Sequence, residues 1–103
     1  MEFFETDDNV TFEVYLRQAD GTTPVTLQAG DTINLRAKRP QDTTTRVRVG
    51  AIVDGPTGRV SFTIPAGFFP AGDYQAQVQV IRAGGTSTFH SEIFRFQIMR
   101  GVP

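Results

Sequence analysis

The chain carries few of the side chains that enzymes use for nucleophilic or metal-assisted chemistry. His90 is the only histidine among 103 residues, and there is no cysteine. A hydrolase triad needs a base beside its nucleophile, and a typical zinc site needs several His or Cys ligands. We therefore expect no enzyme activity, no catalytic residue, no metal site and no cofactor, and we interpret His90 as a surface imidazole.

The aspartates fall where the chain is expected to turn. Asp20, Asp31, Asp54 and Asp73 each stand next to a glycine. An aspartate in such a position bonds to the backbone of its own turn, which accounts for all four without a ligand. The alternative is a calcium ion at an acidic loop, for which the run 7–9 (Asp-Asp-Asn) is the candidate.

Half of the ten basic residues stand in one short segment that contains Arg36, Lys38, Arg39, Arg46 and Arg48. Alternation places Arg36 and Lys38 on the outer face of one strand. It places Arg46 and Arg48 on the outer face of the next, so a hairpin would join the four charges in one patch. This patch is interpreted either as a solvated face that protects a sheet edge, or as a docking surface for an acidic partner. In a repeated assembly that partner could be the acidic N-terminal segment of a neighbouring copy.

Two adjacent phenylalanines, Phe3 and Phe4, are a second candidate partner contact. Neighbouring residues of a strand point to opposite faces, so only one of the two enters the core easily. The other needs a cover, which either a loop of the same chain or a partner would supply. Phe68 and Phe69 pose the same question, and we expect the end of the domain to bury both.

The elements that carry these residues are strands, because apolar and polar residues alternate along most of the chain. Clusters of Gly, Asp and Pro between the alternating stretches predict turns. The segment 65–73 could add one helical turn, and two short strands are expected at 3–4 and 25–27. The alternation predicts six longer strands, over residues 10–17, 32–38, 46–53, 60–64, 74–80 and 94–98.

In the expected strand 46–53, the shared buried face consists of Val47, Val49, Ala51 and Val53. This assignment is what turns Arg46 and Arg48 outward. A polar loop over 40–45 closes the hairpin between this strand and the one before it.

Strands of this number and spacing predict one immunoglobulin-like antiparallel β-sandwich of seven to eight strands over residues 1–103. Without cysteines, hydrophobic packing alone must hold the two sheets together. No apolar run approaches the roughly 20 residues that cross a membrane, and the N-terminus lacks the features of a signal peptide. A net charge of −1 gives no general attraction to nucleic acid or membranes, so neither is expected as a partner.

Several segments resemble a known family in pattern. They are Asp54–Pro65, the run Ala71-Gly72-Asp73-Tyr74 with the strand after it, Ser91–Ile98, and the early Phe12–Leu16 with Asp20-Gly21. Together they are similar to the immunoglobulin-like N-terminal domain of bacteriophage baseplate upper proteins. Gly-Asp-Tyr at the start of a late strand also resembles the tyrosine corner of immunoglobulin-like domains, which implies a structural role for Tyr74.

The resemblance implies a structural protein of the phage particle, made in the bacterial cytoplasm and located in the virion. Its partners would be other virion proteins and copies of itself. We expect no downstream coiled coil or receptor-binding domain of the kind the family carries, so a baseplate, tail, collar or capsid-decoration subunit all fit. The alternative function is a carbohydrate- or cell-surface-binding adhesion module, for which Tyr15 is the candidate outward aromatic residue and a host-surface glycan the ligand.

Overall fold

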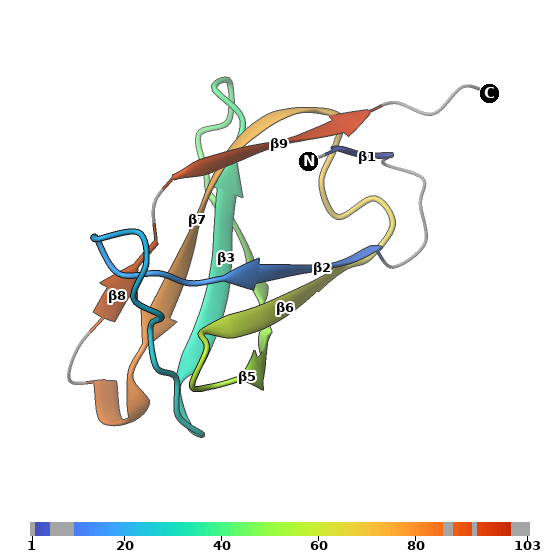
Figure 1. Cartoon of the computed structure of the whole chain (residues 1–103). Coiled ribbons are helices and arrows are strands. Elements are labelled where there is room, and N and C mark those ends of the chain that lie inside the picture. The colour runs from blue at the N-terminus through green and yellow to red at the C-terminus, as the bar shows by residue number, and fades with distance from the viewer. Residues whose placement is uncertain (1, 5–9, 86–87, 92, 100–103) are drawn as a thin grey trace.

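The structure is a computed structural model that describes residues 2–4, 10–85, 88–91 and 93–99. Within these residues, strands form two sheets that pack face to face (Figure 1). The expectation of an all-β sandwich is confirmed. The strands are β1 (Glu2–Phe4), β2 (Val10–Tyr15), β3 (Thr32–Lys38), β4 (Arg46–Val49), β5 (Ala51–Asp54), β6 (Arg59–Ile64), β7 (Gly72–Ile81), β8 (Thr88–His90) and β9 (Phe94–Met99).

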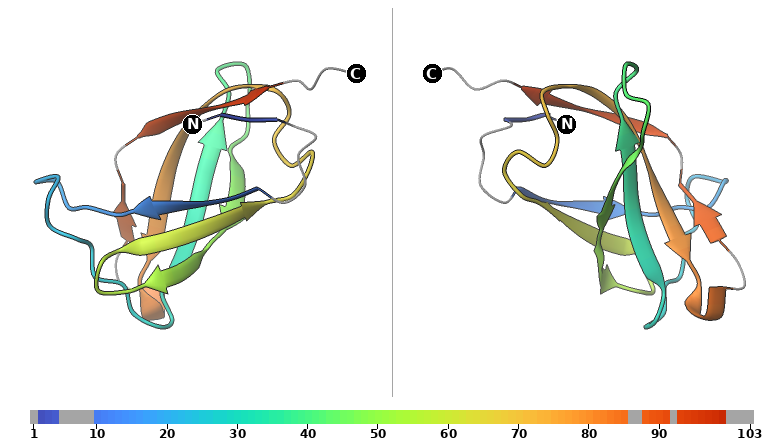
Figure 2. Two further views of the ribbon diagram at one scale, coloured as in Figure 1. Left: turned by 45° about the vertical axis from the view of Figure 1, so that its right-hand side comes forward. Right: turned by 180° about the vertical axis from the view of Figure 1, so that it is seen from behind.

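The sheet order is that of an immunoglobulin-like domain. The large sheet has the order β1-β9-β7-β3-β4, with β8 also on β7, and the small sheet has the order β2-β6-β5. Of these pairings, β1 with β9 is parallel and the others are antiparallel. In immunoglobulin terms, β2, β6 and β5 take the places of strands B, E and D, while β9, β7 and β3 take those of G, F and C. The two turned views in Figure 2 show the small sheet crossing one face of the large sheet.

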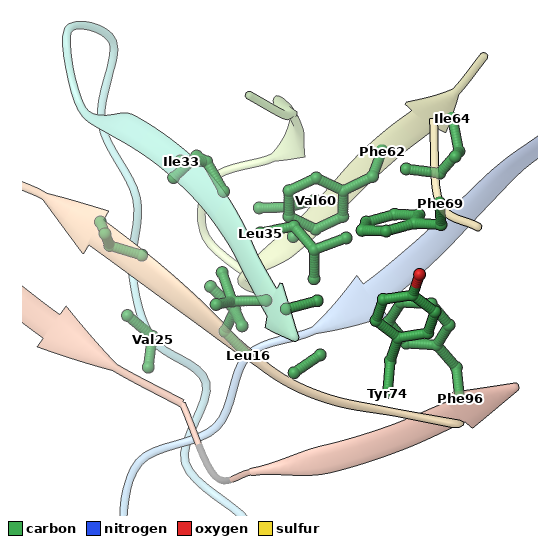
Figure 3. Close-up of a cluster of buried hydrophobic side chains, with 14 of the residues drawn as sticks. Leu16, Val25, Ile33, Leu35, Val60, Phe62, Ile64, Phe69, Tyr74 and Phe96 are labelled. Atoms are coloured by element: carbon green, nitrogen blue, oxygen red, sulfur yellow. The ribbon is translucent and has the colours of Figure 1, made fainter. Parts of the chain in front are cut away.

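The core fills the space between the sheets with side chains that alternate along each strand. On β6 these are Val60, Phe62 and Ile64, and they meet β3 and β7 residues such as Leu35 and Val78. Figure 3 shows the aromatic end of this cluster, where Phe69, Tyr74 and Phe96 lie together. A fully buried side chain of this size contributes roughly 1.5–3 kcal/mol. Phe69 is buried, as expected, whereas Phe68 is only partly buried and packs against the core.

The expectation of one strand over 46–53 is wrong. The chain leaves the large sheet after β4, passes Gly50, and enters the small sheet as β5. A Cβ atom on Gly50 would lie 2.4 Å from Cε1 of Phe62, so only glycine lets the backbone pass so close to the core. On β5, Ile52 is the residue that packs against the core, whereas Val53 is 45% exposed.

Two other expectations differ from the structure, and two elements were not expected. The segment 25–27 is extended but is not a strand; its amides at Val25 and Leu27 donate to the carbonyls of Leu16 and Gly55 at 3.0 and 2.9 Å. The segment 65–73 forms a hydrogen-bonded turn instead of a helical one. The 3₁₀ turn falls instead at Ala83–Gly85, and the unexpected strand β8 follows it.

Asp31 bonds to the backbone of its own turn, as expected for a turn aspartate. Its carboxylate accepts from the amides of Gln28 and Ala83, both at 3.0 Å, and from Nη1 of Arg82 at 2.8 Å. The side chain is only 3% exposed. The amide of Gln28 holds the pKa of Asp31 below its ordinary value of 3.8. The amide of Ala83 and the guanidinium of Arg82 also lower this pKa, whereas burial raises it.

Replacing Asp31 with Asn is expected to remove part of the acid sensitivity of the fold. A pKa lowered by folding stabilises the native state above the unfolded pKa, and this stabilisation is lost as pH falls through the folded value. Urea denaturation at several pH values should therefore show wild type more stable than Asp31→Asn at pH 7, with the difference shrinking below about pH 4. A difference that stayed constant down to pH 2 would contradict this role.

Candidate functional site

The structure divides the expected basic patch between two faces of the large sheet. In the β3–β4 register, Leu35 lies opposite Arg48 and Ala37 lies opposite Arg46. Cross-strand partners point to the same face, and Leu35 and Ala37 are both buried. Arg46 and Arg48 therefore point to the inner side, and the expectation that they lie on the outer face is wrong.

The two inward arginines close the edge of the sandwich beside β4. Nε of Arg48 donates to the Thr63 carbonyl of the small sheet at 2.8 Å, and its guanidinium lies over the Phe68 ring at 5.6 Å. Arg46 lies near Tyr74: burial raises the pKa of Tyr74, while Arg39 and Arg46 oppose that rise. Both arginines have contacts within the domain, and their expected role in partner contact stays a prediction.

Arg36 and Lys38 are exposed on the outer face, as expected. The strand registers set their neighbours in rows that run across the sheet. The outer face thus carries cations and side-chain amides, with valines on its β4 edge. The rows are Lys38–Gln75–Arg95, then Val47–Arg36–Gln77, then Val49–Asn34–Gln79–His90.

A bulge interrupts the edge strand next to β7. The register runs from Gln79 opposite His90 to Ala76 opposite Phe94, so the segment between β8 and β9 holds one residue more than β7 does. Ser91 keeps the ladder closed, because its amide donates to the Val78 carbonyl and its Oγ accepts from the Val78 amide, both at 2.9 Å. The bulge leaves Ile93 65% exposed.

The bulge borders a shallow hollow of about 250 Å³ on the outer face. Gln77 is fixed in it, because its Nε2 donates to the Ser91 carbonyl at 2.8 Å. No acidic residue is among the described residues that line it. Those with exposed polar or apolar groups are Arg36, Lys38, Thr45, Gln75, His90 and Ile93.

The other end of this face is the edge strand β4, whose valines point outward. Val47 is 46% exposed and Val49 is 66% exposed. Among the described strands, β4 pairs only with β3, so its second backbone edge is not covered by a strand. Edge strands more often carry charges that prevent pairing with another chain. The sequence could not show this, because the pattern Arg-Val-Arg-Val fits either orientation of the strand.

Phe3 and Phe4 lie on the strand β1, as the sequence predicted. Their backbones stand opposite Ile98 and Met99 of β9 in the parallel register. The side chains of both phenylalanines lie outside the described part of the structure. Their expected role in partner contact therefore stays a prediction.

Tyr74 sits two residues after the start of β7, which is strand F of the immunoglobulin arrangement. Its hydroxyl donates to the carbonyl of Pro70 at 2.5 Å, and its ring is buried. Figure 3 shows the ring stacked on that of Phe96, and the two ring centroids are 5.1 Å apart. This is the contact that the likeness to a tyrosine corner implied.

Tyr15 is 53% exposed on the small sheet. Guanidinium groups of Arg17 and Arg59 lie over its ring at 5.4 and 5.9 Å. Beside it, a hollow of about 300 Å³ opens between β2 and the bulge, where Gln18 and Ile93 are among the lining residues. An exposed ring with polar neighbours beside a hollow is an arrangement that sugar-binding sites use.

Within the described residues, no group of three or more His, Cys, Asp or Glu side chains could hold a metal ion. Nor does any helix in that part of the chain have the length and apolar composition of a membrane span. Comparison with known proteins finds no matching family model and no matching curated sequence. The fold thus defines the class as an immunoglobulin-like β-sandwich, and function has to be argued from its surface.

Proposed function

We propose that this chain is a structural building block of a bacteriophage particle that docks on neighbouring virion proteins through the outer face of its large sheet. It would be made in the bacterial cytoplasm and act in the virion as one of many copies, with no catalytic role. The support for the phage assignment is the resemblance of its turn and strand segments to the immunoglobulin-like domain of baseplate upper proteins.

The observation that carries docking is the β4 edge. Val47 and Val49 are exposed on a strand whose outer backbone edge has no strand partner among the described residues. Exposed aliphatic side chains beside free backbone groups favour association with another protein, either by packing on the face or by adding a strand to the sheet. The adjacent row of cations and amides supplies the polar rim that such an interface needs.

Replacing both Val47 and Val49 with Lys is expected to abolish docking without unfolding the domain. The test compares wild type and variant by sedimentation velocity and by co-purification with phage particle proteins. Because both side chains are exposed, the free energy of unfolding should change by no more than about 0.5 kcal/mol per site. The matched control is Val53→Lys, which alters an equally exposed valine on the small sheet.

Equal association of the double variant and wild type would contradict docking through β4. A wild-type chain that remains monomeric and binds no particle protein would overturn the proposed function itself. The exposed Tyr15 beside its hollow favours carbohydrate binding as the second candidate function. Specific retention on a glycan array, lost on replacing Tyr15 with Ala, would decide for that candidate.

A further inference from the structure

Three cations surround two amide side chains on the outer face of the large sheet. Lys38 and Arg95 stand on either side of Gln75 in one cross-strand row. Arg36 stands beside Gln77 in the next row, two residues from Lys38 on the same strand. We call Arg36, Lys38 and Arg95, with Gln75 and Gln77, the cation–amide cluster.

Strand geometry fixes the spacing of these charges. Lys38 and Arg95 are two strands apart, which corresponds to about 9.6 Å between their backbones. Arg36 and Lys38 are two residues apart on one strand, which corresponds to about 6.8 Å. The three cations therefore form a right angle, with arms of about 6.8 and 9.6 Å.

Among the described residues, none forms an ion pair with a cation of the cluster. Asp73 lies one row beyond Gln75, opposite Gln97, and the register places Glu2 of β1 on the other side of Gln97. The described ion pairs of the domain join other residues: Arg39 with Asp42, Arg59 with Glu13, and Arg82 with Asp31. The cluster therefore favours a ligand that brings carboxylates to it.

The chain itself contains an acidic segment whose charge is opposite to that of the cluster. Glu5, Asp7 and Asp8 precede β2 in the sequence, and Asp7 and Asp8 follow Glu5 by two and three residues. This segment joins Phe4 to Val10. β1 runs parallel to β9, so Phe4 lies opposite Met99, at the end of β9 remote from Arg95 (Figure 1). Phe4, from which the segment starts, therefore lies four residues along β9 from Arg95.

We propose that the cation–amide cluster binds the acidic segment Glu5–Asp8 of a second copy of this chain. Arginine offers paired N–H donors to a carboxylate, and the side-chain amides satisfy neighbouring polar groups of an extended segment. Each copy supplies one acidic segment and one cluster, so the contact links copies in series or closes them in a ring. This inference rests on the proposed function, in which many copies assemble in one particle.

A charge-exchange experiment tests the pairing. The first variant carries Arg36→Glu and Lys38→Glu, and the second carries Asp7→Lys and Asp8→Lys. Sedimentation equilibrium is expected to show self-association of each variant weakened by about tenfold or more, because like charges now meet. An equimolar mixture of the two variants should regain association, since one copy's reversed segment matches the other's reversed cluster. A misfolded variant would not be rescued, so the mixture is its own control.

A peptide probe gives a second measurement. A synthetic peptide with the sequence of residues 1–9 should bind the full chain, and binding should weaken as salt rises. The same peptide with Gln at position 5 and Asn at positions 7 and 8 should bind at least about tenfold more weakly. Association that survives both charge reversals, or equal binding of the two peptides, would overturn the inference. The proposed function would survive that result as long as Val47→Lys with Val49→Lys still abolished docking.

Discussion

Replacing Gly50 with Ala is expected to destabilise the domain by about 3 kcal/mol, because overpacking a core forces side chains and backbone to move. The new Cβ would lie 2.4 Å from Cε1 of Phe62 and 2.8 Å from the carbonyl oxygen of Ser61. Phe62 is fully buried, and the Ser61 carbonyl belongs to a paired strand, so neither contact can be relieved by a flexible side chain. Urea denaturation of the two proteins measures the loss.

The control for Gly50→Ala is Gly67→Ala. Gly67 has a φ of 76°, but a Cβ there meets nothing within 4 Å. Its replacement should cost about 1–2 kcal/mol from backbone strain alone. If Gly50→Ala were no more destabilising than Gly67→Ala, the close passage of the chain between the sheets would not be the constraint on this position.

The second large effect is expected at Tyr74. Tyr74→Ala removes a ring that stacks on Phe96 and meets Phe69 edge-on at 5.0 Å, and it should cost about 4 kcal/mol as an unfilled core cavity. Tyr74→Phe keeps the ring and removes only the hydroxyl that donates to Pro70. The carbonyl left without this donor should cost about 1–2 kcal/mol.

Thermal or urea unfolding of both Tyr74 variants gives the two contributions separately. Tyr15→Phe is the matched control, because its hydroxyl belongs to an exposed ring and its loss should change stability by less than about 0.5 kcal/mol. Equal stability of Tyr74→Phe and wild type would mean that the hydroxyl contributes nothing to fixing the turn before β7.

Most of the fold follows from alternation, because a sheet with one wet face leaves a period of two in the sequence. The strand 32–38 matches β3 residue for residue, and the polar loop after it closes the β3–β4 hairpin. Alternation failed at 46–53 for a physical reason. Valine and arginine alternate there with the same period whichever of them faces inward, and the long arginine side chains can cover apolar neighbours with their stems.

The candidate site was only half predictable. The exposure of Arg36 and Lys38 follows from the buried residues between them on the same strand. Arg95 joins them only through the β7–β9 register, which links residues far apart in the sequence. The bulge that exposes Ile93 is one extra residue in a strand, and composition alone gives no sign of it.

The pairing of β1 with β9 has a consequence for how the domain is made. Glu2 stands opposite Gln97, so β1 is synthesised more than ninety residues before the strand it pairs with. Until synthesis reaches β9, the amides and carbonyls of β1 cannot form the hydrogen bonds of this pairing. The chain between β1 and β9 must also bring its two ends together before the contact forms. The β1–β9 contact is thus available only to a chain translated through β9, and a chain truncated before β9 would leave β1 without this partner.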